Sequence, residues 1–450
     1  MIRDAQGNAV STSAEAVRAF DHVVEGYLTY RADTAQRLAP LIAADPEFGL
    51  AHILKGYLAM AAVDGALVPR AREALGTAGP HLRRGTPRER AHAEALAAWI
   101  NGDIARTLAI WEEIQEEHPR DVLALRLHHV IAFWSGRSER MLTRVERIVP
   151  RWSSDVPGWG AVLACRAFAH EEFGNYTLAE VCGREALSLD PANLWATHAV
   201  AHVMEMQGRR SEGIRFLEGM EQHWEGGNAF THHLWWHQAL YHLERREFQA
   251  ALGLYDRRFR DLDSPLVRVM PDFTTDVQNA CSMLFRLELR GVDVGARWTE
   301  LADKAELRIG DHLSPFTLPH RMMALAAASR WEAVEQMLAA MREAAQSNRA
   351  GTVAPVLREA ALPVCKAVLA HRRGDFAAAV EVMRSALGLM HRLGGSHAQQ
   401  DVLEQLFLDS ATKAGSEADM RLLLERVAGR HPVPPERRIG YAEAARRIAR

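Results

Sequence analysis

The sequence predicts an all-α fold organised as a helical repeat. Apolar residues recur at intervals of three and four along almost the whole chain, and Ala, Leu, Glu and Arg dominate it. No stretch combines sustained apolar–polar alternation with β-branched enrichment, so strands are not expected. Of the 450 residues, 48% are hydrophobic and 25% are charged, which is typical of a globular protein that folds without metal or disulfides.

The spacing of the predicted turns gives the repeat length. The segment 174–191 runs from Gly174-Asn175-Tyr176 to an Asp-Pro pair and fits the tetratricopeptide pattern of two helices joined by a small residue. Gly102 and Gly136 are 34 residues apart, and so are Gly174 and Gly208, which is the tetratricopeptide period. Further turns of this kind are expected at 246–248, 329–331 and 374–376. We therefore predict an α-solenoid of degenerate tetratricopeptide-type helix hairpins, curled into a superhelix with a concave pocket.

The predicted organisation is a single solenoid over residues 1–450. Degenerate helix pairs are expected over 1–100, the best-formed repeats over 101–260, and C-terminal repeats with a cap over 321–450. The region 261–320 holds two insertions, 261–276 and 310–319, that are rich in Pro, Ser and Asp. Because long loops beside a groove are often functional, we expect them to act as lids.

Charge and cysteine content exclude several classes of partner. Lys plus Arg number 54 against 57 Asp plus Glu, a formal net charge of -3, so neither nucleic acid nor a membrane is expected as a partner. The N-terminal segment 1–13 is polar and unlike a signal peptide, and no apolar run reaches membrane-spanning length. Four cysteines lie far apart without a CxxC motif, as in a protein with reduced thiols. A cytoplasmic location is the expectation.

Two helical ladders are the most informative motifs. The first reads His198-x3-His202-x2-Glu205 and the second His233-x2-Trp236-His237-x3-Tyr241. Residues three, four or seven apart share one helix face, so each ladder presents imidazole, indole and acid where Leu and Ala would normally pack. If each lies on the helix before a repeat turn, the two should face the concave groove from neighbouring helices. The preceding helices would add Arg166 and His170.

The segment 197–256 resembles the tetratricopeptide-repeat protein 38 family, whose H-x-x-A-H-x-x-E-M and H-x-x-W-H-x-A-L-Y elements are matched by His198–Met206 and His233–Tyr241. The resemblance continues through 281–284, 291–298 and the Gly394–Asp401 segment, over roughly the C-terminal two thirds. One departure is His397, where the family relative has an amide. The resemblance implies an α-solenoid of degenerate repeats and supplies no established activity.

The favoured hypothesis is an enclosed pocket that binds a small molecule and acts on it by acid–base chemistry. Histidines near neutral pKa can exchange protons with a substrate, together with a carboxylate. The candidate catalytic residues are His202, Glu205, His237, Asp276 and His320. The candidate ligand-binding residues are His198, His233, Trp236, Tyr241, Arg166, His170 and Asp401.

Three alternatives stay open. No cofactor is predicted and no metal ligands are assigned, but His198 and His202 could chelate a zinc-like ion with His233 or His237; the absence of HExxH makes this the less favoured hypothesis. The ladders could instead be an interior polar network that locks helices together. The chain could also be a non-catalytic scaffold that binds a peptide or protein in its groove. Whether it is an enzyme stays undecided.

Overall fold

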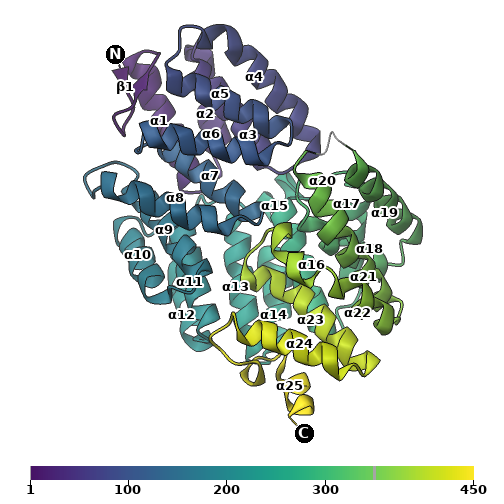
Figure 1. Ribbon diagram of the computed structural model, residues 1–450. Coiled ribbons are helices and arrows are strands. Elements are labelled where there is room, and N and C mark those ends of the chain that lie inside the picture. Colours follow the sequence, from purple (N-terminus) through teal and green to yellow (C-terminus); the bar gives the residue numbers. More distant parts are fainter. Residues whose placement is uncertain (1, 348–350, 450) are drawn as a thin grey trace. The chain divides into compact units, whose positions relative to one another are not determined.

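The computed structural model describes residues 2–347 and 351–449, which are helical almost throughout (Figure 1). The sheet in this part of the chain is a short hairpin in which β1 (Ile2–Arg3) pairs antiparallel with β2 (Ala9–Val10). The predicted all-α class is therefore confirmed. None of the described helices combines the length and the apolar character needed to cross a bilayer.

The helices follow one another with short connections. In the N-terminal part they are α1 (Ala14–Leu28), α2 (Thr34–Ala44), α3 (Gly49–Ala61), η1 (Gly65–Leu67), α4 (Val68–Leu82), α5 (Pro87–Ile100), α6 (Ile104–Glu117), α7 (Val122–Trp134), α8 (Ser138–Ile148), η2 (Val149–Arg151), α9 (Trp159–Glu172), α10 (Tyr176–Leu189), α11 (Leu194–Met206), α12 (Arg210–Met220) and η3 (Glu221–His223). The C-terminal part holds α13 (Phe230–Glu244), α14 (Phe248–Leu254), η4 (Tyr255–Phe259), α15 (Pro265–Val269), α16 (Thr274–Glu288), α17 (Arg297–Glu306), α18 (Thr317–Ala327), α19 (Trp331–Gln346), α20 (Val353–Val356), η6 (Leu357–Ala361), α21 (Leu362–Arg372), α22 (Phe376–Arg384), η7 (Leu387–Leu393), α23 (His397–Ala414), α24 (Glu417–Ala428), η8 (Pro435–Arg437) and α25 (Ala442–Ile448).

The chain divides into two compact units. The first holds residues 2–200, 220–230 and 351–352, and the second holds 201–219, 231–347 and 353–449. Sequential helices pack as hairpins within each unit, for example α9 with α10 in the first and α21 with α22 in the second. This pairing is the hairpin arrangement that the repeat spacing predicts.

The repeat turns use left-handed backbone at the predicted positions. Gly102, Gly136, Gly174 and Gly208 have φ of 74°, 67°, 77° and 68°, each at the end of the first helix of a hairpin. Glycine adopts this conformation without steric cost, which explains its 34-residue recurrence. Arg246 occupies the same conformation at φ 62°, so that turn forms without glycine.

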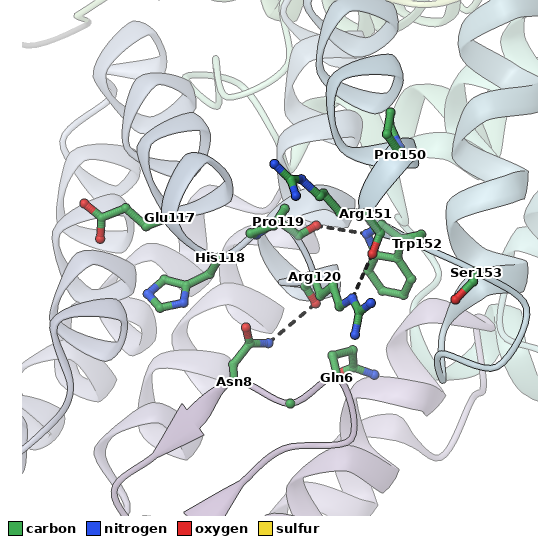
Figure 2. Close-up of a pocket in the computed structure, with 11 residues that line it drawn as sticks. Gln6, Asn8, Glu117, His118, Pro119, Arg120, Pro150, Arg151, Trp152 and Ser153 are labelled. Atoms are coloured by element: carbon green, nitrogen blue, oxygen red, sulfur yellow. Dashed lines mark hydrogen bonds between the residues drawn. The ribbon is translucent and has the colours of Figure 1, made fainter.

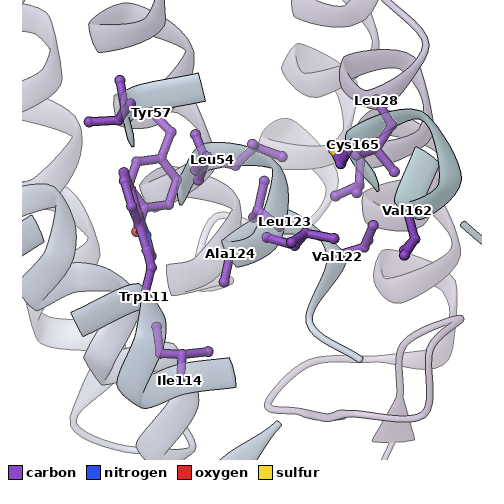
Figure 3. Packing of buried hydrophobic residues seen from close by; sticks show 14 of the residues in the cluster. Leu28, Leu54, Tyr57, Trp111, Ile114, Val122, Leu123, Ala124, Val162 and Cys165 are labelled. Atoms are coloured by element: carbon purple, nitrogen blue, oxygen red, sulfur yellow. The ribbon is translucent and has the colours of Figure 1, made fainter. Parts of the chain in front are cut away.

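The core of the first unit is assembled around α7. Figure 3 shows Leu123 and Ala124 of this helix between the Tyr57 and Trp111 side chains and a group containing Leu28 and Cys165. All of these residues are buried. A central helix that is apolar nearly all round is expected to be enclosed by its neighbours.

The two predicted insertions contain more helix than expected. The short α15 forms inside 261–276, and α16 begins at Thr274, so Asp276 lies in the first turn of a helix. Within 310–319, α18 begins at Thr317. The Arg308 side chain forms ion pairs with Asp272 (2.7 Å) and Asp311 (3.3 Å), which tie the two insertions together.

Candidate functional site

Three buried histidines come together inside the second unit. His202 lies on α11, and His233 and His237 lie one turn apart on α13. The centroid of the His237 ring is 4.4 Å from that of His202 and 4.7 Å from that of His233. One ring nitrogen of each lies within 4.8 Å of those of the others. We call these three residues the histidine cluster.

A tyrosine and a glycine hold α13 against its neighbours at this place. The Tyr241 hydroxyl donates a hydrogen bond of 2.6 Å to the carbonyl oxygen of Ala201 on α11. On α12, Gly213 leaves room for the Tyr241 ring, because a Cβ atom there would lie only 2.4–2.8 Å from it. Tyr241, a predicted ligand-binding residue, is thus buried between helices and fixes the distance between α11 and α13.

Polar partners orient two of the clustered rings. Nδ1 of His237 is 2.7 Å from Oε2 of Glu205, and Nδ1 of His233 is 3.0 Å from Oδ1 of Asn279 on α16. The amide oxygen of Asn279 can only accept a hydrogen bond, and so can the ionised carboxylate of Glu205, so with Glu205 ionised each Nδ1 carries the proton and donates it. This assigns one tautomer to each ring and leaves Nε2 as the nitrogen with a lone pair.

Burial sets the protonation of the site. It lowers the pKa of His233 and of His237 well below the usual value, and neighbouring imidazoles lower them further. Burial also raises the pKa of Glu205 to about 7, although His202 and Arg286 oppose this. The His233 and His237 rings are therefore neutral at neutral pH, the form in which imidazole binds a metal.

An aromatic ring and an arginine cover the cluster. The Trp236 ring stacks on His233 at 5.1 Å between centroids, and the guanidinium of Arg286 lies 5.8 Å from the Trp236 ring centre. Arg286 is itself buried and donates to the carbonyl oxygen of Ala398. The neighbouring Trp235 stacks on His232, with 6.1 Å between the ring centroids.

A small polar cavity adjoins Glu205. Its volume is about 40 Å³, which suits water-sized molecules. Charged side chains around it include Glu205, Arg286, Asp401 and Arg438. Oδ2 of Asp401 is 3.3 Å from Arg286, and Oδ1 is bound by Arg438. Although burial opposes it, these two arginines hold the pKa of Asp401 below its usual value.

The other two candidate catalytic residues have different partners. Oδ2 of Asp276 is 2.7 Å from Nδ1 of His232, and both side chains are 1% exposed. Burial raises the pKa of Asp276 despite this contact. His320 donates from Nδ1 to the carbonyl oxygen of Phe316 at 2.9 Å, and burial lowers its pKa to about 4.

Three candidate residues lie in the first unit. His198 precedes His202 by one turn of α11 and stacks on Trp195 at 4.7 Å. The ladder spacing is confirmed, since both histidines lie on one helix. Arg166 and His170 both bind Glu146 of α8, at 2.6 and 2.8 Å. These last two contacts join neighbouring helices of the repeat.

The sequence interpretation missed three residues that matter here. Asn279 and Arg286 lie on α16 and His232 on α13, and all three contact members of the candidate set. A signal existed for two of them: Asn279, Ser282 and Arg286 recur at intervals of three and four, which predicts a polar stripe on a helix. The choice of Asp276 rather than Glu205 as the partner of His232 depends on how the helices pack.

No family model matches the chain. Solved structures with similar folds include "Human IFIT1 dimer with PPP-AAAA", at 12% identity and a TM-score of 0.43 over 98% of this chain and 96% of that chain. The yeast Tom70 crystal structure matches at 10% identity and a TM-score of 0.40, over 96% of this chain and 86% of that chain. The P58(IPK) TPR domain matches at 14% identity and a TM-score of 0.23, over 79% of this chain and 88% of that chain. The chain's own hairpins and 34-residue turns make it a TPR-like helical array.

Proposed function

We propose that this TPR-like protein binds a divalent transition-metal ion, with Zn²⁺ as the best chemical fit, through His202, His233 and His237. The observation that carries the proposal is the convergence of three buried imidazoles whose ring nitrogens lie within 4.8 Å of one another. A tetrahedral zinc ion with Zn–N bonds of about 2.0–2.1 Å needs nitrogens closer together than this limit, so binding draws the rings inward.

The hydrogen bonds behind the rings support the same function. A metal-bound histidine almost always donates its other N–H to a carboxylate or an amide or carbonyl oxygen, which fixes the tautomer and the ring orientation. Glu205 accepts from His237 and Asn279 accepts from His233, both through Nδ1. Neutral imidazoles favour Zn²⁺, Cu²⁺ and Ni²⁺ over the hard cations Mg²⁺ and Ca²⁺, which prefer oxygen.

Acid–base chemistry by His202, Glu205 and His237 is the second candidate function. The 2.7 Å His237–Glu205 contact and the cavity beside Glu205 favour it. Because that cavity is about 40 Å³, the reactant in contact with Glu205 would be water or a molecule of similar size. In the metal-binding proposal Glu205 has a different task, since it positions His237.

Metal binding is tested on the full chain after any affinity tag has been removed. The protein is stripped with a chelator, dialysed and titrated with Zn²⁺ against a chromophoric competitor, and Co²⁺ is used in parallel for its visible absorption bands. We expect one tight site per chain and a tetrahedral cobalt spectrum. His237→Ala should weaken Zn²⁺ binding by more than 100-fold, while Asn279→Ala should weaken it by about 10–100-fold because only the orienting hydrogen bond is lost.

The matched control is His371→Ala, which removes another largely buried imidazole of the second unit that is paired with Asp409. Its zinc affinity should equal that of the unmodified chain. Absence of tight binding in the unmodified chain, or equal affinity in the His237→Ala and His371→Ala variants, refutes the metal proposal. If His237→Ala folds but, in the absence of metal, is less stable than the unmodified chain and this is its only difference, the histidines serve to lock the helices together.

A further inference from the structure

The histidine cluster is covered by side chains that an incoming metal ion has to pass. Its three imidazoles belong to residues that are at most 3% exposed. Of the partners that orient or cover the rings within the second unit, Asn279 and Trp236 are each 1% exposed. Glu205 differs from them, because 18% of its side chain is exposed. Glu205 therefore joins the buried cluster to a part of the unit that solvent reaches.

The cavity of about 40 Å³ lies on the solvent side of Glu205. Four more of its lining residues are half-buried and so reach solvent as well: Arg210, Glu244, His397 and His431. Glu205 lines the cavity and the clustered histidines do not. The 2.7 Å contact between Glu205 and His237 is thus the boundary between the two. An ion in the cavity is separated from the cluster by this one pair of side chains.

The arginines of the cavity are already engaged, whereas Glu205 has capacity for a cation. Its Oε2 contacts His237, and its Oε1 has no hydrogen-bond partner in the part of the chain that the structure describes. In the same part of the chain, no arginine or lysine nitrogen lies within 4 Å of its carboxylate. The three arginines bind other acids: Arg286 and Arg438 bind Asp401, and Arg210 binds Glu244 at 2.8 Å.

His397 supplies a nitrogen ligand at the rim of the cavity. It is the first residue of α23, and its ring has no hydrogen bond or ion pair with any described residue. The start of the helix does not depend on it, because Ser396 and Gln399 form the capping box. Imidazole is a common ligand of Zn²⁺, Cu²⁺ and Ni²⁺. The half-buried ring can therefore meet an ion that arrives from solvent.

The size of the cavity makes such ligands necessary. Its volume of about 40 Å³ suits water-sized molecules, so an ion with a complete hydration shell does not fit. The ion has to lose water molecules as it enters, and protein ligands replace them. Zn²⁺ accepts both imidazole nitrogen and carboxylate oxygen, at about 2.0–2.2 Å.

We propose that this cavity is the entry route of the metal ion and that His397 and Glu205 form a transient site for a divalent transition-metal ion within it. The inference rests on the proposed metal function. The ion binds the His397 ring at the rim and then Oε1 of Glu205. It reaches the cluster when the Glu205–His237 hydrogen bond opens, and this bond then forms again. Each step exchanges one ligand of the ion for another and releases water, and the oxidation state does not change.

The test separates the rate of metal uptake from the equilibrium affinity. The metal-free full chain is mixed with Zn²⁺ in a stopped-flow instrument, with a fluorescent chelator as the reporter, and release to excess chelator is followed separately. We expect His397→Ala to slow uptake and release equally, by at least about tenfold, the lower end of the effect of a lined cleft on the arrival of an ion. Its affinity for Zn²⁺ should be unchanged, because the cluster is intact.

A second variant obstructs the route and keeps His397. Ala398 also lines the cavity and is 5% exposed, so Ala398→Met places a larger side chain in its wall. We expect slower uptake and release in this variant too, again at an unchanged affinity. Circular dichroism verifies that each variant is folded.

The matched control is His118→Ala. His118 is also half-buried, and its ring likewise makes no hydrogen bond to a described residue. It lines a different hollow, of about 640 Å³, in the first unit, where the turn between α6 and α7, the turn after α8 and the tip of the β-hairpin meet (Figure 2). The rates of zinc uptake and release should equal those of the unmodified chain.

The possible outcomes distinguish the entry route from the metal function. If the unmodified chain does not bind Zn²⁺ tightly, the metal function is refuted and the entry route with it. If it binds Zn²⁺ and His397→Ala leaves both rates unchanged, the entry route alone is overturned. A loss of affinity in His397→Ala makes His397 a ligand of the final site and also overturns the transient role. Equal slowing in His118→Ala overturns the route as well, since the effect is then not local.

Discussion

Histidines on α13 differ in the atom that binds Nδ1, and this difference decides what each can do. His232 has a carboxylate, Asp276, at 2.7 Å; His233 has the amide oxygen of Asn279 at 3.0 Å; His237 has the carboxylate of Glu205 at 2.7 Å. Of these three, His233 and His237 belong to the cluster that also contains His202. Sequence spacing identified the face of the helix but not these partners, which come from α11 and α16.

At the residue scale, Gly213→Ala should destabilise the second unit. The added Cβ would lie 2.4–2.8 Å from the Tyr241 ring, so the ring must shift and strain its hydrogen bond to Ala201. We expect a loss of about 1–3 kcal/mol in the free energy of unfolding, the usual range for overpacking, measured by urea denaturation.

Gly219→Ala is the matched control on the same helix, because a Cβ atom there meets nothing within 4 Å. It should be neutral or stabilising by up to about 1 kcal/mol, since alanine restricts the unfolded chain. Equal stability of the two variants would show that Tyr241 does not limit the approach of α12.

At the scale of elements, polar contacts between helices fix the register of successive hairpins. Glu112 on α6 accepts a hydrogen bond from His128 on α7 at 2.9 Å and one from Arg140 on α8 at 2.8 Å. The analogous carboxylate one hairpin later is Glu146 on α8, which binds Arg166 and His170 of α9. The predicted ligand-binding residues Arg166 and His170 thus have structural partners of their own, which the sequence pattern alone could not reveal.

Glu112 should make the stability of the first unit depend on pH. Burial opposes ionisation, but His128 and Arg140 lower the pKa of Glu112 to about 2, from 4.5. A lowered folded-state pKa contributes stability that is present above pH 4.5 and is lost as the pH falls toward 2. We expect Glu112→Gln to lower the free energy of unfolding by about 1–2 kcal/mol at neutral pH, a figure already reduced because the carboxylate is partly exposed. This loss should become progressively smaller as the pH falls from 4.5 to 2.

The comparison variant is Glu113→Gln, which removes a neighbouring acid whose side chain is 61% exposed and pairs with Arg106. Its cost should stay below about 0.5 kcal/mol across the same range. Urea denaturation at a series of pH values measures both differences, and a cost of Glu112→Gln that does not change with pH would contradict the assignment.

At the scale of the whole molecule, residues far apart in sequence meet at Asp401 in the second unit. Its carboxylate is bound by Arg438 and Tyr441 from the C-terminal segment, by Arg286 of α16 and by Gln405 of α23. This joins the last described helices to the wall of the cavity beside Glu205. Asp401, predicted as a ligand-binding residue, makes all of these contacts with the protein itself.

We expect Asp401→Asn to lower the free energy of unfolding by about 3–5 kcal/mol, because it leaves two buried guanidinium groups without their counter-ion. Hydrogen exchange of the segment 435–448 should accelerate at the same time. Asp409→Asn, on the same helix but paired with His371 and Lys413 at a site that is 22% exposed, should cost less than about 1 kcal/mol. Similar losses in the two variants would mean that Asp401 does not hold the C-terminal segment in place.

The sequence by itself determined the helical class, the hairpin repeat and the left-handed turns at Gly102, Gly136, Gly174 and Gly208, because these depend on local periodicity and backbone sterics. It also placed His202, Glu205, His233 and His237 on shared helix faces, since i, i+3 and i, i+4 spacing is a property of one helix. Only the tertiary structure decided which faces meet. The pairing of His237 with Glu205, of Asp276 with His232 and of Asp401 with Arg438 depends on helix packing and on segments up to 44 residues apart, which no local pattern encodes.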